Sequence, residues 1–428
     1  MADRTLAVWH VASLLVSTSC GIGFFLGTGE LALQQGMAAC LYAVATAIGL
    51  VALALSAPRL QKTGQSIWTY FGSLYGPAIS QQVAAFSLIW MTGVLSAQIR
   101  GASAILALSG MPQVASIISV DCLVLVFSFL RISWLSGMFA LCMCGCTAIL
   151  ALALTETHSL ILWLHAPAIF VESIRTQPVE HTGLVLLSVA ALVLCGADYQ
   201  QFPAMARTPT HARSGCLIAA MIVLAIGFLP AAAVIAGANL WQLDRLSDPM
   251  QVVPTLLVGA TGSSAQITSL VVTCVLIITA LGSACSILRA MSDATANVSR
   301  GTSMPPVFHR MLPIFAATLV AIRGQSIINV MVTLNIVYLA AVVPLLVLTL
   351  LGYPIQDRSA KRSMFIGAVV STVCVLIGWT RAIHIPEVTP LVLAWPCASV
   401  VAFRSHTPAT QAESHCLSAQ ELGQRSQG

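Results

Sequence analysis

Residues 20–30 read CGIGFFLGTGE, a glycine-rich run inside an apolar segment that begins near residue 6. Such a run could hold a phosphate group, or it could interrupt a membrane helix. A dinucleotide-binding fingerprint needs the spacing G-x-G-x-x-G after a strand. Here Gly21, Gly23 and Gly27 place the third glycine one position late, in apolar surroundings. The run therefore favours an interrupted membrane helix, which can also pack closely through the small residues Gly23, Gly27 and Thr28.

The composition also indicates a membrane protein. Of the 428 residues, 58% are hydrophobic and only 8% are charged, a balance that excludes an ordinary soluble protein. A helix needs roughly 20 apolar residues to cross a bilayer, and the sequence holds about twelve such segments. We expect these transmembrane helices near residues 6–35, 36–58, 80–109, 113–131, 133–155, 183–203, 214–237, 264–292, 307–323, 325–352, 364–380 and 387–403.

The basic residues predict the orientation, because loops rich in Lys and Arg stay on the cytoplasmic side. With Met1 inside, the odd-numbered connections hold only Arg175, Arg245, Arg323 and Arg381. We therefore expect an integral protein of a bacterial inner (plasma) membrane with both termini in the cytoplasm. Topology accounts for the net charge of +5, so no nucleic-acid partner is expected. The even-numbered connections hold Arg59, Lys62, Arg131, Arg207, Arg213, Arg300, Arg310, Arg358, Lys361 and Arg362.

The apolar segments form two blocks of five, and each block opens with an interrupted helix. The interruptions lie at residues 17–23 and 195–201, and Pro203 closes the second. Because five is odd, the second block enters the membrane from the opposite side, and paired broken helices in inverted halves mark a transporter site at the midplane. We expect one all-α transmembrane domain over residues 1–403, with repeats at about 6–155 and 183–352, two added helices at about 364–403, and a short disordered cytoplasmic tail at 404–428.

Two further stretches, 159–171 and 249–258, are apolar but too short to cross. We expect them to be interfacial or re-entrant.

Other classes of protein fit the sequence less well. The nine His residues lack metal-ligand spacing, and the thirteen Cys residues lie almost entirely in apolar segments, so neither an enzyme nor a disulfide framework is expected. A channel would need a continuous polar pore. A sensor that has lost transport on the same fold stays open, as does the oligomeric state.

An unwound turn frees backbone carbonyls that suit a dehydrated alkali cation. The carbonyls of Ser17 and Cys20 are the candidates at the first break. The eighth segment contains TALGSACS, where Thr279, Ser283 and Ser286 supply hydroxyls. These hydroxyls could equally bond to carbonyls of their own helix.

The chain resembles the sodium:solute symporters, which share the LeuT-like inverted-repeat fold of the amino acid-polyamine-organocation superfamily. GIGFFLGTGELALQQG, APRLQKTGQSIWTYFGSLYG, GADYQQF, SDPMQVVPTLL and ALGSACSILRAMSDA carry this resemblance. It implies a sodium site formed by the carbonyls of Ser17, Cys20 and Thr279 and by two adjacent hydroxyl side chains. Those two positions fall on Gly282 and Ser283, and Gly282 has no hydroxyl. Sodium coupling, proton coupling and uncoupled transport therefore stay open, with no cofactor besides Na⁺ or H⁺.

A second resemblance is to the nucleobase:cation symporters. GADYQQFPAMART is similar to the run that follows their sixth helix, although Gln201 stands where that family has Arg. Both resemblances imply the same fold and differ mainly in the solute, so a nucleobase or cytosine-type permease is the alternative to other small solutes.

Ionisable and aromatic residues within the membrane suggest the solute site, because charges there are costly. Asp198 could bind a proton or an amine, or it could cap the following half-helix. Glu30 and Arg100 could form a gate or a structural ion pair, while Asp121 has no assigned role. Aromatic rings and a few amides suit a small neutral or zwitterionic organic solute. The expected solute-binding residues are Gly21, Phe24, Trp90, Gln98, Cys195, Asp198, Tyr199, Asn335 and Tyr338.

Overall fold

The computed structural model describes residues 5–107, 110–130, 132–246, 248–262, 266–299, 305–322, 327–380 and 387–403. Within these ranges every regular element is a helix, and the only extended pairing is an isolated bridge between Leu6 and Ala206. The predicted tail at 404–428 lies outside the described residues. So do four of the arginines behind the predicted orientation, Arg131, Arg300, Arg323 and Arg381.

The first block of helices follows the predicted order, with one addition. A short helix, α4, precedes the third predicted segment, and η1 is a 3₁₀ turn where the second segment was expected to begin. The helix after it runs to Thr63 rather than residue 58, and Gly64, with φ of 60°, ends it in the left-handed conformation. The elements are α1 (Val8–Ser19), α2 (Ile22–Gln35), η1 (Gly36–Cys40), α3 (Leu41–Thr63), α4 (Ile67–Tyr75), α5 (Pro77–Ala107), α6 (Gln113–Phe127), α7 (Ile132–Glu156) and α8 (Leu160–Ile174).

The second block also follows the predicted order. The predicted segment 214–237, the seventh of the twelve, divides at Phe228 into two helices. The eleventh predicted segment begins seven residues earlier than expected, at Asp357, because its charged first turns are helical too. The elements are α9 (Val179–Cys195), α10 (Ala197–Ala204), α11 (Pro209–Gly227), α12 (Leu229–Gly237), η2 (Leu243–Arg245), η3 (Pro249–Gln251), α13 (Val252–Ala260), α14 (Gln266–Val298), α15 (Phe308–Ala321), α16 (Ile327–Leu350), α17 (Asp357–Thr380) and α18 (Thr389–Phe403).

Length and hydropathy support a membrane-embedded chain. Among the described residues, five helical stretches are long and apolar enough to cross a membrane, and seven are if each bent pair counts as one span. The remaining predicted segments are apolar helices of 10–17 residues, with α16 counted over Leu334–Leu350 only. Large apolar side chains such as Leu55, Leu141, Met221 and Phe365 are more than 60% exposed, as lipid-facing residues should be.

Both interrupted helices are present where the sequence predicted them. The first break is narrower than the predicted 17–23, because only Cys20 and Gly21 separate α1 from α2. The second is narrower than the predicted 195–201: only Gly196 separates α9 from α10, and the two halves meet at a bend of 42°. The reason is that residues 197–204 already form hydrogen-bonded helix, beginning with Tyr199 and Gln200 N–H donating to Gly196 O.

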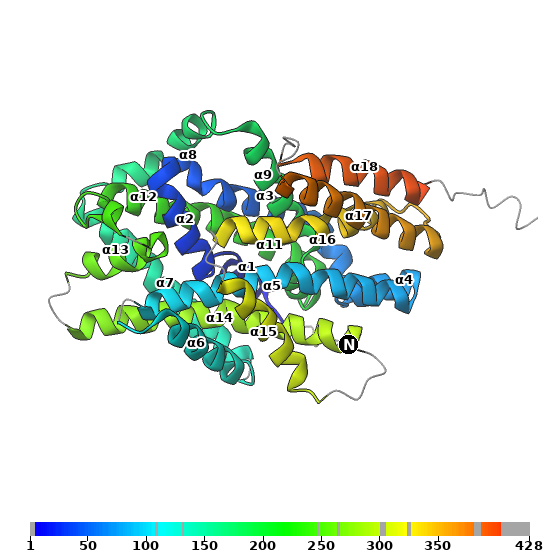
Figure 1. Ribbon diagram of the computed structural model, residues 1–428, viewed down its shortest axis with the longest axis horizontal. Helices are drawn as coiled ribbons and strands as arrows, with labels where there is room; N and C mark the ends of the chain where they lie inside the picture. The colour runs from blue at the N-terminus through cyan, green and yellow to red at the C-terminus, as the bar shows by residue number, and fades with distance from the viewer. Residues whose placement is uncertain are drawn as a thin grey trace, which may run out of the picture.

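The two stretches that were expected to be interfacial or re-entrant, 159–171 and 249–258, are helical. Stretch 159–171 lies in α8, which turns 103° from the second half of α7 instead of continuing it. Stretch 249–258 lies in η3 and α13. In Figure 1, α8 and α13 lie at one end of the bundle, whereas α4 lies at the opposite end.

Helices from the two blocks interleave in the core. α3 packs against α9 and α11, and α5 packs against α14, α15 and α16. Small residues permit this closeness: a Cβ on Gly49 of α3 would lie 2.9 Å from the carbonyl oxygen of Ala190 on α9. Packing of this kind drives helix association in lipid, where the hydrophobic effect between helices is absent.

A short backbone pairing, which we call the N-terminal clasp, joins residues 5–6 to residues 205–207. Leu6 N–H donates to Met205 O at 3.2 Å, and Arg207 N–H donates to Leu6 O at 2.9 Å. The Arg207 guanidinium also donates to Thr5 O, and the amide of Gln61 donates to Ala206 O. The clasp ties the start of α1 to the end of α10, so it links one half of each broken helix to the other.

Candidate functional site

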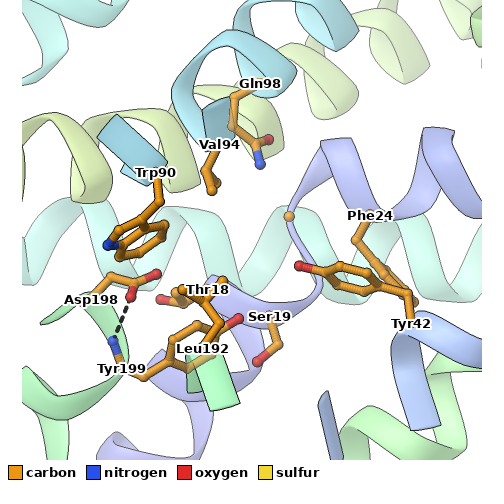
Figure 2. Close-up of a pocket in the computed structure, with 11 residues that line it drawn as sticks. Thr18, Ser19, Phe24, Tyr42, Trp90, Val94, Gln98, Leu192, Asp198 and Tyr199 are labelled. Carbon is orange, nitrogen blue, oxygen red and sulfur yellow. Dashed lines mark hydrogen bonds between the residues drawn. The ribbon is translucent and has the colours of Figure 1, made fainter. Parts of the chain in front are cut away.

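The two breaks meet at one buried cavity beside α5. Figure 2 shows Trp90, Val94 and Gln98 from α5 above the first break, with Asp198 and Tyr199 from α10 on one side and Phe24 and Tyr42 on the other. The cavity measures about 20 Å³, room for about one water molecule. Its lining comprises Thr18, Ser19, Gly21, Phe24, Tyr42, Trp90, Val94, Gln98, Leu192, Asp198 and Tyr199.

Sterics explain the glycine at the first break. Gly21 has φ of −62° and ψ of 172°, an extended conformation that other residues also adopt. A Cβ at this position, however, would lie 2.8 Å from Ser283 Oγ and 3.2 Å from Gln98 Nε2. The break therefore needs glycine because α14 and α5 approach its backbone too closely for a side chain.

Two backbone carbonyls at the first break, those of Ser17 and Cys20, lack the hydrogen bonds of a continuous helix in the part of the chain that the structure describes. Cys20 N–H donates to Val16 O at 2.8 Å and ends α1, and Phe24 N–H donates to Gly21 O at 2.9 Å and begins α2. Within the described residues, no backbone N–H donates to the carbonyl of Ser17 or Cys20. These are the two carbonyls that the sequence nominated for a cation.

Gln98 compensates for one missing helix bond. Its Oε1 accepts from Gly23 N–H at 3.1 Å, which satisfies an amide at the open start of α2. Trp90, Val94 and Gln98 are spaced four residues apart, so they share the face of α5 that points at the break. The α5 face thus supplies an aromatic ring, an apolar side chain and an amide to one cavity.

Asp198 lies in the first turn of α10 and is 2% exposed. Its Oδ1 accepts from Tyr199 N–H at 2.9 Å, the bond drawn in Figure 2. A helix N-terminus favours a carboxylate there, since its N–H groups carry partial positive charge. The N-cap residue of α10 is Gly196, so Asp198 does not occupy the predicted capping position, whereas it does line the cavity.

The second break is held by side chains from outside it. The Gln200 amide donates to Leu194 O at 2.7 Å across the bend, and Tyr338 Oη donates to Cys195 O at 2.6 Å. Tyr338 lies on α16, and its ring centroid is 5.8 Å from that of Trp90. A side chain of α16 therefore satisfies the Cys195 carbonyl that the break exposes.

Six of the nine expected solute-binding residues line the cavity: Gly21, Phe24, Trp90, Gln98, Asp198 and Tyr199. Cys195, Asn335 and Tyr338 do not line it in this conformation. Asn335 is fully buried, and neither atom of its amide has a hydrogen-bond partner among the described residues. The same holds for Trp90 Nε1. An unpaired buried amide is costly, so a partner in another conformation or a bound molecule is the physical expectation.

Sequence reasoning missed five lining residues: Thr18, Ser19, Tyr42, Val94 and Leu192. Thr18 and Ser19 lie within the predicted interruption at 17–23, so their place beside the break could have identified them. Val94 lies one turn from both Trp90 and Gln98, so helical spacing could have identified it. Nothing in the sequence marks Tyr42 or Leu192, because only the packing of α3 and α9 brings them to the cavity.

The expected cation residues lie near one another only in part. Ser283 abuts Gly21, and it is buried with Thr279 on α14. Both hydroxyls donate back to their own helix, Ser283 to Ala280 O at 3.2 Å and Thr279 to Val275 O at 2.8 Å. Thr279 Oγ1 also lies 3.7 Å from Cys146 Sγ on α7. Gly282 adds no hydroxyl beside Ser283.

Arg100 lies between α5, η3 and α15. Its guanidinium donates to Met250 Sδ at 3.3 Å and to Ala321 O at 3.2 Å. Asp121, on the peripheral helix α6, bonds to the Thr318 hydroxyl on α15 at 2.8 Å. The ion pair between Glu30 and Arg100 stays a prediction, and Asp121 lies away from the cavity.

Comparison with known proteins identifies the fold. No protein-family model matches the chain, and no curated protein matches its sequence significantly. The structure is similar to the substrate-bound outward-open state of a Na⁺-coupled sialic acid symporter, with a TM-score of 0.72 and 12% identity over 93% of this chain and 88% of the other. It is also similar to inward-facing Mhp1, with a TM-score of 0.59 and 10% identity over 97% and 92% of the two chains.

A third similar structure is Mhp1, a nucleobase-cation-symport-1 family transporter, in a closed conformation with bromovinylhydantoin bound. Its TM-score is 0.55 at 13% identity, over 96% of this chain and 93% of the other. Identities this low establish shared architecture and leave chemistry to the residues themselves. The chain is an all-helical membrane protein with the LeuT-like inverted-repeat fold of these symporters.

Proposed function

We propose that this protein is a secondary active transporter that moves a small organic solute by alternating access. The observation that carries the proposal is the meeting of two broken helices at one buried cavity that contains the Asp198 carboxylate. Broken helices at the midplane expose backbone groups only where they face a cavity or a ligand. A cavity of about 20 Å³ is too small for an organic solute, so helices must separate to admit one.

The coupling ion in this proposal is Na⁺, with H⁺ as the alternative. The contact of Ser283 with Gly21 supports a cation between α14 and the first break, as do the carbonyls of Ser17 and Cys20, which accept no backbone N–H within the described residues. A Na⁺-coupled symporter among the similar structures is consistent with it. Asp198 supports the alternative, because a buried carboxylate at the second break could carry a proton.

The solute in this proposal is neutral or zwitterionic. Trp90 offers an indole face and an unpaired N–H, Gln98 an amide, and Asp198 a carboxylate. A nucleobase is the second candidate, because a planar heterocycle could stack on Trp90 and bond to Gln98. We assign the protein to a bacterial inner membrane. The placement of α4, which follows the basic residues Arg59 and Lys62, opposite α8 and α13 supports the predicted orientation with a cytoplasmic N-terminus.

The test has two stages. Purified protein is screened by thermal shift against amino acids, nucleobases and sugar acids, with and without Na⁺ and at several pH values, because any ligand of the native state stabilises it. A stabilising solute is then followed into proteoliposomes under a Na⁺ gradient, a pH gradient or neither. Binding without uptake under every gradient would contradict transport and favour a sensor.

A further inference from the structure

A second cavity, of about 150 Å³, lies at the end of the bundle that we assign to the outside. We call it the outer pocket. Ser103 and Ala104 of α5 form a buried floor, and Gln113 at the start of α6 forms an exposed rim. The full lining is Arg100, Ser103, Ala104, Ala107, Gln113, Asp248 and Gln251, which shares no residue with the central cavity.

Two oppositely charged residues, Arg100 and Asp248, line this pocket, and no ion pair joins them among the described residues. The Arg100 guanidinium donates from Nε to Met250 Sδ at 3.3 Å and from Nη1 to Ala321 O at 3.2 Å, and neither acceptor is charged. Asp248 Oδ1 accepts only from Met250 N–H, at 3.1 Å, among the described residues. Arg100 and Asp248 lie beyond the 4.0 Å limit of an ion pair. These contacts hold both charged groups in place and leave hydrogen-bonding capacity on each, since a guanidinium has five N–H donors.

The geometry selects the ligand's charges. An anion alone would bond to Arg100 but face the Asp248 carboxylate, and a cation alone would meet the reverse repulsion. A molecule with a carboxylate and an ammonium satisfies both, because a carboxylate can take two parallel bonds from a guanidinium. A cavity of about 150 Å³ holds a molecule the size of benzene, which matches an amino acid with a small side chain.

We propose that the outer pocket binds a small zwitterionic amino acid, with its carboxylate on Arg100 and its ammonium on Asp248. The pocket then collects solute at the outer end before the central cavity opens. This second step rests on the proposed function, whereas the binding itself does not.

Three probes of matched shape test the binding. L-Alanine carries both charges, propionate lacks the ammonium, and ethylamine lacks the carboxylate. Titration of the full-length protein in lipid nanodiscs should show binding of L-alanine. Each single-charge probe should bind at least tenfold more weakly. Equal binding of all three would overturn the proposal, and so would the absence of measurable L-alanine binding.

Substitutions locate the site. Arg100→Gln and Asp248→Asn should each weaken L-alanine binding at least tenfold, and Arg100→Lys should weaken it less. Asn still caps η3, so Asp248→Asn keeps the loop folded. Ala104→Leu would fill the floor without changing any charge and should also abolish binding. Arg245→Gln is the control, because Arg245 lies in the same loop region, is exposed and bonds to Gln242.

Asp198→Asn separates this pocket from the central cavity. L-Alanine binding that survives Asp198→Asn but is lost in Arg100→Gln supports the outer pocket. Loss in Asp198→Asn with no change in Arg100→Gln would place the amino acid in the central cavity and overturn the proposal. A protein that binds L-alanine at the outer pocket but transports no solute would contradict the proposed function alone.

Discussion

Gly21 is the residue on which the first break depends, because α5 and α14 leave no room for a side chain. In Gly21→Ala, the new Cβ would lie 2.8 Å from Ser283 Oγ. Overpacking of this kind costs about 1–3 kcal/mol, so the unfolding temperature in detergent should fall. Gly145→Ala on α7 is the matched control, since its Cβ meets only Val275 at 3.6 Å. Equal stability of the two variants would contradict this reading of Gly21.

Ser283 carries the cation part of the proposal. Ser283→Ala removes the α14 hydroxyl that lies against Gly21, so sodium-dependent uptake in proteoliposomes should fall at least tenfold. Thermal stability without sodium should change little, because the lost bond to Ala280 O is a helix back-bond of 3.2 Å. Uptake that keeps its full sodium dependence would place the cation elsewhere and leave Asp198 as the proton-coupled alternative.

Side-chain chemistry predicted part of the site. Glycine spacing, an intramembrane carboxylate and single aromatic residues identified six cavity-lining residues. The sequence could not show that Tyr338 bonds to Cys195 O, or that Arg100 turns toward Met250, because those contacts depend on how distant helices cross. Nor could it show that the Gln98 amide satisfies Gly23 N–H, a contact between residues 75 positions apart.

At the scale of elements, the N-terminal clasp links α1 with α10. Removal of residues 1–6 would delete the acceptor for Arg207 N–H and the donor to Met205 O. Each lost hydrogen bond is worth about 0.5–1.5 kcal/mol. Hydrogen exchange should therefore become faster at Arg207, while amides at the centre of α11 should exchange as before. Unchanged exchange at Arg207 would show that α10 holds its position without the clasp.

Hydropathy and the pair of broken helices predicted the order of the helices, but they did not predict where each helix begins and ends. Residues 197–201 were expected to be unwound but are helical, because Gly196 alone accommodates the bend. The short helix α4 was not predicted, since its nine residues are too few for a membrane span. Hydropathy predicts which segments are buried in lipid. Hydrogen bonds at helix ends, which set the boundaries, leave a weaker trace in the sequence.

At the scale of the whole molecule, the proposed cycle must open the core. Cys20 lies in the first break, Cys195 directly precedes the second, and both are fully buried. A small permeant maleimide should label both slowly in the resting protein, and faster once a transported solute and its coupling ion are added. Peptide-level mass spectrometry resolves the two rates. Labelling that stays equally slow during measured uptake would mean that the path does not pass between the breaks.

The size of the central cavity also limits speed. Room for about one water molecule means that no solute can diffuse through a standing path. Each molecule moved must wait for a collective helix rearrangement, which takes on the order of microseconds to milliseconds or longer. Flux should therefore saturate with solute concentration and rise steeply with temperature, and single-channel current steps should be absent. The tight packing around the central cavity would therefore make the protein a slow carrier that moves one solute molecule in each conformational cycle.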